Sequence, residues 1–367
     1  MTISKCVKNV ENGKPFKNKA TPKKKWRQHY PTYENQLKNE KIRNKVLLKC
    51  LLVNRFQFLT TNTTTMNFKY YINSPRELCA TLVKKCLFFL SDEMYLKIMY
   101  YVRMSQKLDL ENPTRFTEKL QWLKLNYRRT IFHDMVDKIE SKRLVETMLG
   151  KELIIPNLGI WSNFDDINFD MLPNQFVLKT SNGGGSTGVV IVKDKAKLNK
   201  DFAKHRLEAS KKSNIYKTLR EWPYSGIKGR IFAETYMQDE SGELRDYKFY
   251  CFNGEVKVLL VASNRFSDHN FNYYDRNFNP MPIVSNCGKQ LMGTLQKPEK
   301  LDQMIEVAEK LSNGLPHIRI DLYYVNGKIY FGEFTFFDAS GYDDMSSKEW
   351  DLKFGDWLKL PEKIIES

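Results

Sequence analysis

Residues 176–192, FVLKTSNGGGSTGVVIV, fit three different chemical patterns. The glycines at positions 183, 185 and 188 have the GxGxxG spacing of a dinucleotide-binding turn. Gly184, Ser186 and Gly188 have the GxSxG spacing of a hydrolase nucleophile elbow. The whole run is also typical of a glycine loop that covers nucleotide phosphates. The spacing alone does not select one of the three.

The residues after the glycines narrow this choice. A nucleophile elbow and a dinucleotide turn both need a helix directly after the loop, but Gly188 is followed by Val189, Val190, Ile191 and Val192, which favour a strand. A Walker loop would need GK[ST] after the glycines, and a protein kinase would need HRD and DFG segments. The sequence has none of these, which argues against both classes. The sequence therefore predicts a glycine hairpin preceded by Lys179. The backbone N–H groups of the glycine loop can wrap phosphate oxygens. The alternative is a flexible surface hairpin.

A second group of chemically active residues lies in the segments HIRIDLYY and KIYFGEFTFF. Alternation along a strand puts His317, Arg319 and Asp321 on one face of the first segment. In the second segment Glu333 and Thr335 share a face. Two carboxylates that converge beside an arginine suit Mg²⁺ that bridges phosphates. An exposed hairpin would hold only an ordinary salt bridge.

The turn between these two segments decides whether the carboxylates meet. A two-residue turn at Asn326–Gly327 would pair Asp321 with Gly332 and send Glu333 to the opposite face. A three-residue loop with Gly327 in the left-handed conformation would pair Asp321 with Phe331 and put Glu333 diagonally on the same face. We expect the three-residue loop, because the metal-site interpretation requires it.

The rest of the sequence predicts an α+β chain, in which strands and helices mix without regular alternation. Apolar spacing indicates two amphipathic helices over residues 77–104, broken near Ser91 and Asp92. This basic pair could lie on a membrane surface, although packing on the adjoining domain is the commoner use. Further helices are expected over residues 112–125, 135–150, 199–221 and 301–314, with strands over 228–261.

The net charge of +16 comes mainly from residues 1–55, where 15 Lys and Arg face three Glu. This segment lacks apolar periodicity and is typical of a solvated, disordered arm. Contact with anionic lipid stays open as an alternative, and nucleic acid is the less favoured partner. Met66 follows TTNTTT, so we also consider it as a translation start.

The six cysteines form no CxxC pairs, which argues against a zinc site or a redox motif and favours a reducing cytoplasm. The longest apolar runs, VLLKCLLV and CLFFL, are far below the roughly 20 residues that span a bilayer. We expect a cytoplasmic protein, with peripheral contact at the inner face of the membrane left open.

Several segments taken together resemble one family. They are NPTRFTEKLQWLKL, Lys138, IPNLGIWSNFDDINFDMLPNQFVLK, VLKTSNGGGSTG, FAETYM, RDYKFYCFNG, SNRFSDHNFNYYD and RIDLYYVNGKIYFGEFTF. Their order resembles the TupA-like ATP-grasp family of teichuronopeptide and cell-surface polysaccharide biosynthesis over about residues 80–360. The resemblance implies an ATP-grasp fold, in which two α+β subdomains clasp ATP. The domains then are a tail (1–65), a helical region (66–130) and a catalytic domain (131–360) with its glycine-loop part at about 175–235 and its metal-site part at about 236–360.

The resemblance also implies residue roles. Lys138 and Lys179 match phosphate-contacting lysines, residues 181–188 match the loop over the phosphates, and residues 234–237 match the hinge whose backbone reads adenine. Asp246 matches the acidic residue near the ribose. The residues assigned to the nucleotide are Lys138, Lys179, Ser181, Asn182, Gly183, Gly184, Gly185, Ser186, Gly188, Glu234, Tyr236, Met237 and Asp246.

By the same resemblance Arg319, Lys179 and Lys248 are catalytic. Arg319 matches the arginine that steadies the transferring phosphoryl group, and Asp321 and Glu333 match the Mg²⁺ ligands. Many ATP-grasp enzymes have Asn two residues beyond the second carboxylate, where this chain has Thr335. Thr335 is therefore the third implied metal ligand, with a hydroxyl that binds Mg²⁺ more weakly than an amide oxygen does.

The implied activity is that of an ATP-dependent carboxylate–amine ligase that works through an acyl phosphate with Mg²⁺. Its expected substrates are a saccharide or uronic-acid carboxylate and an amino acid or other amine. No protein nucleophile is needed, which agrees with the five widely spaced histidines. Two alternatives stay open: a non-catalytic, basic-armed protein that binds membrane or nucleic acid, and a phosphotransferase.

Overall fold

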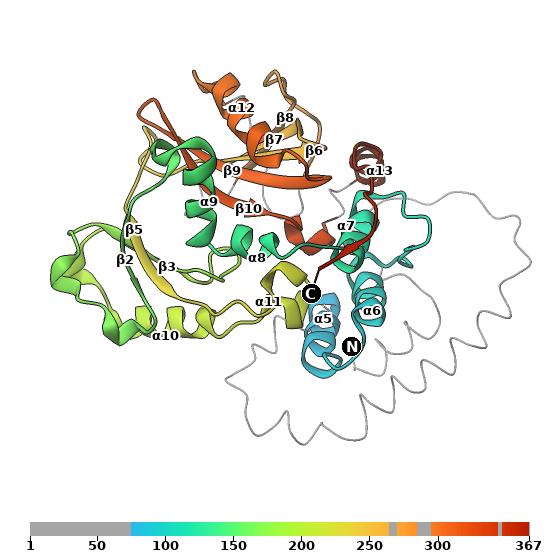
Figure 1. Cartoon of the computed structure of the whole chain (residues 1–367), viewed down its shortest axis with the longest axis horizontal. Helices are drawn as coiled ribbons and strands as arrows, with labels where there is room; N and C mark the ends of the chain where they lie inside the picture. Colours follow the sequence, from blue (N-terminus) through green and yellow to red (C-terminus); the bar gives the residue numbers. More distant parts are fainter. Residues whose placement is uncertain (1–74, 264–269, 285–294, 344–346, 367) are drawn as a thin grey trace, which may run out of the picture. The chain divides into compact units, whose positions relative to one another are not determined.

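The computed structural model describes residues 75–263, 270–284, 295–343 and 347–366. The predictions about residues 1–65, Met66, Cys6, Cys50 and Cys287, and about part of SNRFSDHNFNYYD, lie outside these ranges. The chain divides into two compact units between Lys107 and Leu108 (Figure 1). Each unit is described by itself.

The first unit contains the two predicted amphipathic helices, α5 (Pro75–Cys86) and α6 (Asp92–Met104). Ser91 begins α6 as its N-cap, because its hydroxyl accepts the Met94 N–H. The break predicted near Ser91 and Asp92 is therefore confirmed. Glu77 of α5 and Arg103 of α6 form an ion pair that ties the two helices together.

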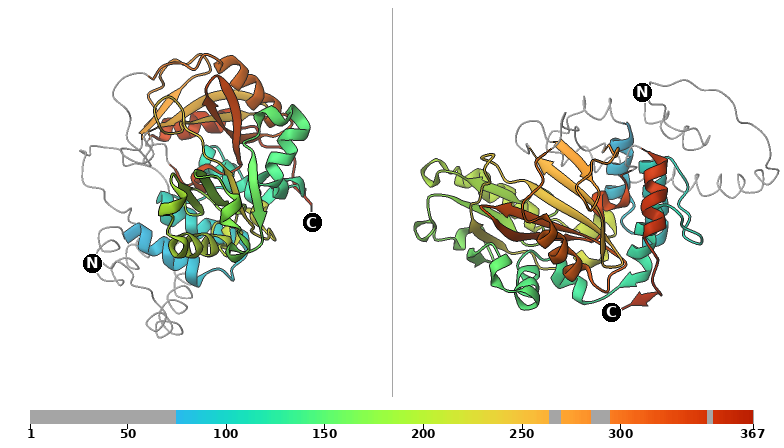
Figure 2. Two further views of the ribbon diagram at one scale, coloured as in Figure 1. Left: turned by 90° about the vertical axis from the view of Figure 1, so that its left-hand side faces the viewer. Right: turned by 90° about the horizontal axis from the view of Figure 1, so that it is seen from above.

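The second unit contains two antiparallel sheets (Figures 1 and 2). The smaller sheet has the strand order β2-β5-β3-β4, and helix α10 (Lys200–Lys211) packs against β3 and β4. Its core gathers aliphatic and aromatic side chains from the strands, from α10 and from the turn at Phe164. The strands are β2 (Asn157–Trp161), β3 (Phe176–Thr180), β4 (Val189–Val192) and β5 (Ile231–Thr235).

The larger sheet has the strand order β10-β9-β6-β7-β8. Helix α12 (Leu301–Ser312) covers one face of it and contacts β6, β7 and β9 (Figure 1). Leu301, Met304 and Leu311 of α12 lie in the same buried core as Ile318 and Ile320 of β9. The strands are β6 (Asp246–Phe252), β7 (Glu255–Ser263), β8 (Asn270–Tyr274), β9 (His317–Val325) and β10 (Lys328–Thr335).

The other α-helices in the described part of this unit are α7 (Phe116–Asn126), α8 (Ile131–Val136), α9 (Glu140–Leu149), the short α11 (Ile215–Leu219) and α13 (Lys348–Trp357). Strands β1 (Tyr127–Arg128) and β11 (Ile364–Ile365) form a small parallel pair. Helix α7 packs against α13, and its Phe116 and Leu120 belong to the core of the larger sheet.

The helix expected over residues 135–150 is broken in two. α8 ends at Val136, and α9 begins at Glu140. The Asp137 carboxylate accepts the N–H groups of Ile139 and Glu140, which gives two backbone donors at the start of α9 an acceptor. The expected end at Gly150 is confirmed, since Gly150 is the C-cap with φ 102°. The break leaves Lys138 in a non-helical position.

Candidate active site

The β9–β10 hairpin brings Asp321 and Glu333 to directly paired positions. The three-residue loop that we expected is wrong: Lys328 pairs with Val325, so the turn is the two-residue Asn326–Gly327, with φ of 49° and 73°. A two-residue turn matches the twist of paired strands. The carboxylates still share a face, because Gly332 forms a β-bulge that shifts the register by one residue.

Gly332 can occupy the bulge because it has no side chain. A Cβ atom there would lie 2.9 Å from the backbone oxygen of Asp321 and 3.1 Å from the Tyr323 ring. One extra residue reverses the alternation of side chains between the two faces of a strand. The bulge therefore places Glu333 opposite Asp321 and Thr335 opposite Arg319.

Arg319 is held by acceptors on all of its guanidinium nitrogens. Its Nε lies 2.7 Å from Asp321 Oδ1 and its Nη2 lies 2.9 Å from Oδ2 of the same residue, a bidentate pair. Nη2 also donates to Thr335 Oγ1 at 3.1 Å, and Nη1 donates to Asp338. Arg319 is only 7% exposed. Its charge is therefore fixed on the polar face of the larger sheet.

Glu333 lies among three cationic side chains. Its Oε2 accepts from Lys138 Nζ at 2.8 Å, and its Oε1 lies 3.8 Å from Arg319 Nη2. Burial would raise the pKa of Glu333, but the charges of Lys138, Lys248 and Arg319 outweigh burial and hold this pKa well below its usual range. Glu333 is therefore ionised at neutral pH, as a cation ligand must be.

Lys248 joins two of the predicted acidic residues on the same face. Its ammonium forms an ion pair with Asp321 and lies 3.6 Å from Asp246 Oδ2. Burial would lower the pKa of Lys248, but Asp246 and Asp321 raise it above the ordinary value. Lys248 pairs with Asp321 in the register of β6 and β9, which explains why the two side chains meet. The structure thus brings Asp246, Lys248, Arg319 and Asp321 together.

The predicted glycine hairpin is formed by β3 and β4, which pair antiparallel from Phe176–Val192 to Lys179–Val189. Two glycines lie tight against its base: a Cβ at Gly183 or Gly188 would come within 2.5 Å or 2.2 Å of Thr180 Oγ1. Gly185, at φ 60°, faces open space. The tip from Gly184 to Thr187 is exposed, whereas Ser181 and Asn182 are buried. The hairpin therefore combines a packed base with an open tip.

Lys138 links this hairpin to the carboxylate pair. Its backbone N–H donates to Ser181 O at 2.9 Å, directly after β3, while its side chain reaches Glu333 on β10. The break between α8 and α9 makes both contacts available, because an N–H within a helix would bond to its own helix. One residue therefore contacts both predicted halves of the site.

Lys179, the predicted phosphate-contacting lysine of β3, is paired with a buried carboxylate. Its ammonium forms an ion pair with Glu234, which is 3% exposed on the neighbouring strand β5. Glu234 Oε2 also accepts from Lys142 Nζ at 2.8 Å. Burial would raise the pKa of Glu234, but Lys179 and Lys142 lower it to about 2. The Glu234 side chain thus contacts a predicted phosphate lysine, in addition to the hinge role assigned to its backbone.

The residues after Glu234 leave the end of β5, an inner strand that pairs with both β2 and β3. Tyr236 and Met237, which follow the end of β5, are half-buried. The Lys193 ammonium lies 6.0 Å from the centre of the Tyr236 ring. Their backbone is thus placed beyond the last ladder residue, Thr235, which pairs with Phe176.

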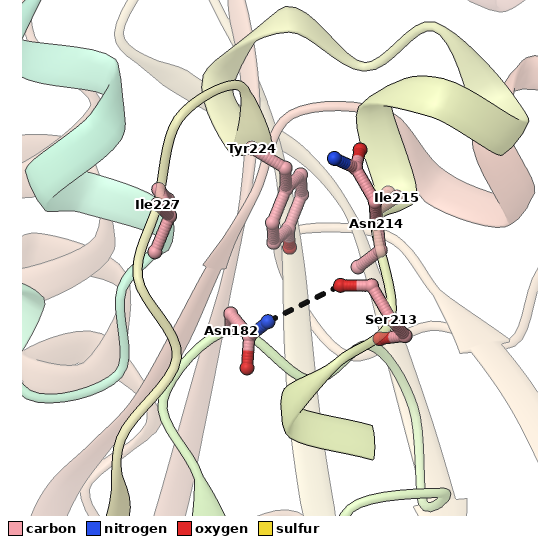
Figure 3. A pocket seen from close by; sticks show the side chains of 6 residues that line it. All are labelled: Asn182, Ser213, Asn214, Ile215, Tyr224 and Ile227. Atoms are coloured by element: carbon pink, nitrogen blue, oxygen red, sulfur yellow. Dashed lines mark hydrogen bonds between the residues drawn. The ribbon is translucent and has the colours of Figure 1, made fainter. Parts of the chain in front are cut away.

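A small pocket lies beside the base of the glycine hairpin (Figure 3). Asn182 and Tyr224 point into the same space from different segments of the chain, and Asn182 donates to the backbone of Lys211 and Ser213 at 3.0 and 3.3 Å. None of the lining side chains is charged. They belong to Asn182, Ser213, Asn214, Ile215, Tyr224 and Ile227.

Sequence reasoning missed two residues that contact the predicted ones. Lys142 looks like an ordinary helical lysine in VDKIESKR, yet it is 5% exposed and also donates to Ile155 O and Asn157 Oδ1. Asp338 follows β10 and contacts both Arg319 and Tyr250. The only signal for Asp338 is its position in DASG, directly after the metal-site strand.

His317 shares the strand but not the chemistry of Arg319. Its ring packs against Phe116 and Phe252, and its Nδ1 lies 2.9 Å from Cys251 O. Burial lowers the pKa of His317 to about 4, so the ring is neutral at neutral pH. His317 therefore packs among aromatic side chains at the start of β9.

The oxygen atoms of Asp321, Glu333 and Thr335 suit a hard cation that also binds water and substrate phosphates. Among the described residues, no group of three or more His, Cys, Asp or Glu is arranged to hold a metal. Asp321 and Glu333 face each other with Thr335 next along β10, which gives two carboxylates and a hydroxyl. Mg²⁺ is commonly bound by one or two carboxylates together with water and substrate phosphates. These residues fit Mg²⁺ on that basis.

Two α+β subdomains, a glycine hairpin on one sheet and a carboxylate pair on the other together define an ATP-grasp protein. Residues 118–359 match the model of the TupA-like ATP-grasp family, so the chain belongs to that family. The resemblance and the α+β ATP-grasp fold predicted from the sequence are thus confirmed. ATP-grasp ligases use ATP and Mg²⁺ and generally join a carboxylate to an amine.

Several solved ATP-grasp structures are similar to this chain. D-alanine–D-alanine ligase from Bacillus anthracis, complexed with ATP, is 15% identical over 59% of this chain and 55% of that chain, with a TM-score of 0.32. The ATP-grasp ligase PsnB, complexed with a variant of its minimal precursor, Mg and ADP, is 11% identical over 75% and 67%, with a TM-score of 0.34. D-cycloserine synthetase DcsG is 13% identical over 61% and 69%, with a TM-score of 0.35.

These similarities are distant, with identities of 17% or less. The match spans 55–62% of the length of the D-alanine–D-alanine ligases. No curated protein matches the chain. Within the described ranges, none of the helices has the length and apolar character needed to cross a membrane.

Proposed function

We propose that this chain is an ATP-dependent carboxylate–amine ligase that forms an amide through an acyl phosphate. One observation carries the proposal. Asp321 and Glu333 occupy paired positions among Lys138, Lys248 and Arg319, and Lys138 ties this cluster to the base of the glycine hairpin. A cluster of this composition is suited to polyphosphate and Mg²⁺, because cations neutralise phosphate charge and carboxylates bind the metal.

In this proposal the nucleotide lies between the two sheets of the unit. Residues 181–188 cover its phosphates, Lys138 and Lys179 contact them, and the backbone of residues 234–237 reads the adenine edge. Asp246 serves the ribose. The exposed tip of the hairpin supports the covering role, because a loop that closes over a ligand must be free to move.

Asp321, Glu333 and Thr335 would hold Mg²⁺, which when bound neutralises the phosphate oxygens during transfer. The acceptor carboxylate oxygen attacks the γ-phosphorus, the bond to the β-phosphate oxygen breaks, and ADP leaves. Arg319 and Lys248 stabilise the negative charge. An amine nitrogen then attacks the acyl carbon, inorganic phosphate leaves, and the nitrogen loses a proton. The protein supplies orientation, positive charge and exclusion of water.

The substrates proposed are a uronic-acid-type carboxylate of a cell-surface saccharide or its precursor and an amino acid or another amine. This assignment rests on the family, whose TupA-like members are associated with surface polysaccharides. ATP would be supplied on the cytoplasmic side, and contact with the inner face of the membrane would bring a lipid-linked acceptor to the enzyme.

The test is ADP release measured with uronic acids crossed with amino acids. We expect ADP release that requires both partners, and mass spectrometry should show a product lighter by one water than the two substrates together. ADP release with the saccharide alone, accompanied by a stable phosphorylated saccharide, would instead identify a phosphotransferase. Absence of nucleotide binding in calorimetry with a nonhydrolysable ATP analogue would refute catalysis altogether.

A further inference from the structure

Arg319 is held by two carboxylates that belong to different segments of the chain. Asp321 accepts from Nε and Nη2, and Asp338 accepts from Nη1. The Asp321 carboxylate has other partners as well, because Lys248 pairs with its Oδ2 and the proposed Mg²⁺ role uses the same carboxylate. Asp338 thus gives Arg319 an acceptor that is independent of Asp321.

Asp338 is itself fixed at both oxygens. Its Oδ1 accepts from Arg319, and its Oδ2 accepts from the hydroxyl of Tyr250. Tyr250 lies on β6, has 0% exposure and pairs with Arg319 in the register of β6 and β9. A carboxylate with a partner on each oxygen has little rotational freedom. The Tyr250–Asp338 contact therefore sets where the Nη1 end of the guanidinium lies.

The turn that carries Asp338 adopts an unfavourable backbone conformation. Ala339 and Ser340 have φ of 44° and 55°, and Gly341 follows with φ 69°. Each non-glycine residue in this left-handed region costs about 1 kcal/mol or more. Such a conformation persists only when surrounding contacts impose it, and strained turns of this kind gather at functional sites.

Helix α7 supplies those contacts. Gln121 Nε2 donates to Ser340 O at 3.1 Å and to Gly341 O at 3.0 Å. The buried Nζ of Lys124 donates to Ser340 O at 2.9 Å and to Ser340 Oγ at 2.8 Å. A Cβ at Gly341 would lie 2.4 Å from Gln121 Nε2, so the turn and the helix fit closely.

We propose that Asp338 is a positioning residue for Arg319: held by Tyr250 and by the strained turn that α7 braces, it orients the guanidinium toward the Asp321–Glu333 pair. This inference rests on the proposed function, in which Arg319 acts on the transferring phosphoryl group. An arginine that acts mainly on the transition state contributes to the rate of the chemical step more than to the binding of ATP. Loss of its positioning carboxylate should therefore change kcat rather than KM.

The test is the Asp338→Asn variant, measured in the full chain under the conditions of ADP release. We expect kcat to fall about 10- to 100-fold, as for other residues that orient a catalytic group, with the KM for ATP changed less than about threefold. Tyr250→Phe, which leaves the Asp338 charge in place, should lower kcat by a smaller factor. The Tyr250→Phe variant also provides the test of the proposal if Asp338→Asn fails to fold.

Asp351→Asn is the matched control for the loss of a buried carboxylate. Asp351 is 4% exposed and accepts from the N–H and hydroxyl of Thr117, both at 2.9 Å. This variant should lower the melting temperature and leave kcat per folded molecule unchanged. The same pattern in Asp338→Asn or in a folded Tyr250→Phe would show a merely structural role and overturn the inference. In contrast, a wild-type chain without ADP release for any substrate pair would count against the proposed function itself.

Discussion

The ammonium of Lys138 lies 2.8 Å from Glu333 Oε2, although the two residues are 195 positions apart in the sequence. Lys138 stands in the break between α8 and α9 and is bonded through its N–H to Ser181 O. The same residue thus anchors the base of the glycine hairpin and partners a proposed metal ligand. Lys138 therefore contacts both the hairpin of the smaller sheet and the carboxylate pair of the larger sheet.

The first prediction concerns the charge of Glu333. Glu333→Gln keeps the size of the side chain but removes a carboxylate that three cations surround. We expect turnover to fall by on the order of 100-fold or more, because transferring phosphate charge is stabilised by the metal that this residue would bind. Steady-state ADP release and circular dichroism measure activity and fold separately.

Glu309→Gln provides the control for that variant. Glu309 lies on α12 and pairs with Arg276, and its Oε1 accepts the Val256 N–H at 3.1 Å. Its loss should leave turnover near the wild-type value. Normal activity in Glu333→Gln would remove Glu333 from the metal site.

The two lysines on Glu234 should respond differently to replacement. Lys179→Met removes a proposed phosphate contact, so we expect the Kd for ATP to rise about 10- to 100-fold, the range for one charged hydrogen bond. Lys142→Met removes a buried ammonium with three acceptors and should cost about 3 kcal/mol of stability. Calorimetry with an ATP analogue and denaturant unfolding separate the two effects.

The opposite assignment would reveal itself in the same experiments. If Lys142→Met weakened nucleotide binding and Lys179→Met only lowered stability, Lys142 would be the phosphate-contacting lysine. Lys179 would then be the structural partner of Glu234.

The strand–loop–strand character of the glycine segment could be predicted from the sequence because it depends on local preferences. Four β-branched residues after Gly188 leave no place for a helix, and β4 forms there. The helix break at Ser91 and the end of α9 at Gly150 are local signals of the same kind. Each of these features is decided by residues close in sequence.

The meeting of Asp321 and Glu333 was predicted, but for the wrong reason. Asn326–Gly327 favours a two-residue turn, which the structure has, and the bulge at Gly332 then restores the shared face. A single glycine within a strand can mark a bulge or a close approach of another backbone, so the sequence does not decide between them. The packing of Gly332 against Asp321 O decides it.

Lys142 and Asp338 were missed because their partners are distant in the sequence. Lys142 becomes a buried residue only when Ile155 O, Asn157 and Glu234 surround it. Asp338 is presented by a turn in which Ala339 and Ser340 adopt left-handed φ values that their residue types do not favour. Tertiary contacts impose both arrangements, and no local pattern encodes them.

A third prediction concerns the tip of the glycine hairpin. Gly185 has φ 60° and faces open space, so Gly185→Val meets no neighbouring atom but strains the backbone by about 1–2 kcal/mol. We expect the KM for ATP to rise several-fold, because the strained tip closes less readily over phosphate, and the melting temperature to fall by only a few degrees. Gly314→Val is the control, since Gly314 has φ 76° and open space at the end of α12. An equal KM in the two variants would contradict a phosphate role for the tip.

The last prediction concerns His317 and pH. Burial lowers the pKa of His317 from 6.5 to about 4, so between these values the unfolded chain binds a proton that the folded chain does not. His317 therefore does not lower the free energy of unfolding above pH 6.5. As the pH falls from 6.5 to 4, protonation of His317 in the unfolded chain lowers the free energy of unfolding by about 3 kcal/mol, at 1.36 kcal/mol per pKa unit. His317→Phe keeps a ring among Phe116 and Phe252 and should lose this part of the pH dependence. Chemical denaturation of wild type and His317→Phe at pH 4–7 measures this difference in slope. Equal slopes in wild type and His317→Phe would mean that the folded protein accepts a charged His317, which its apolar surroundings and single carbonyl partner argue against.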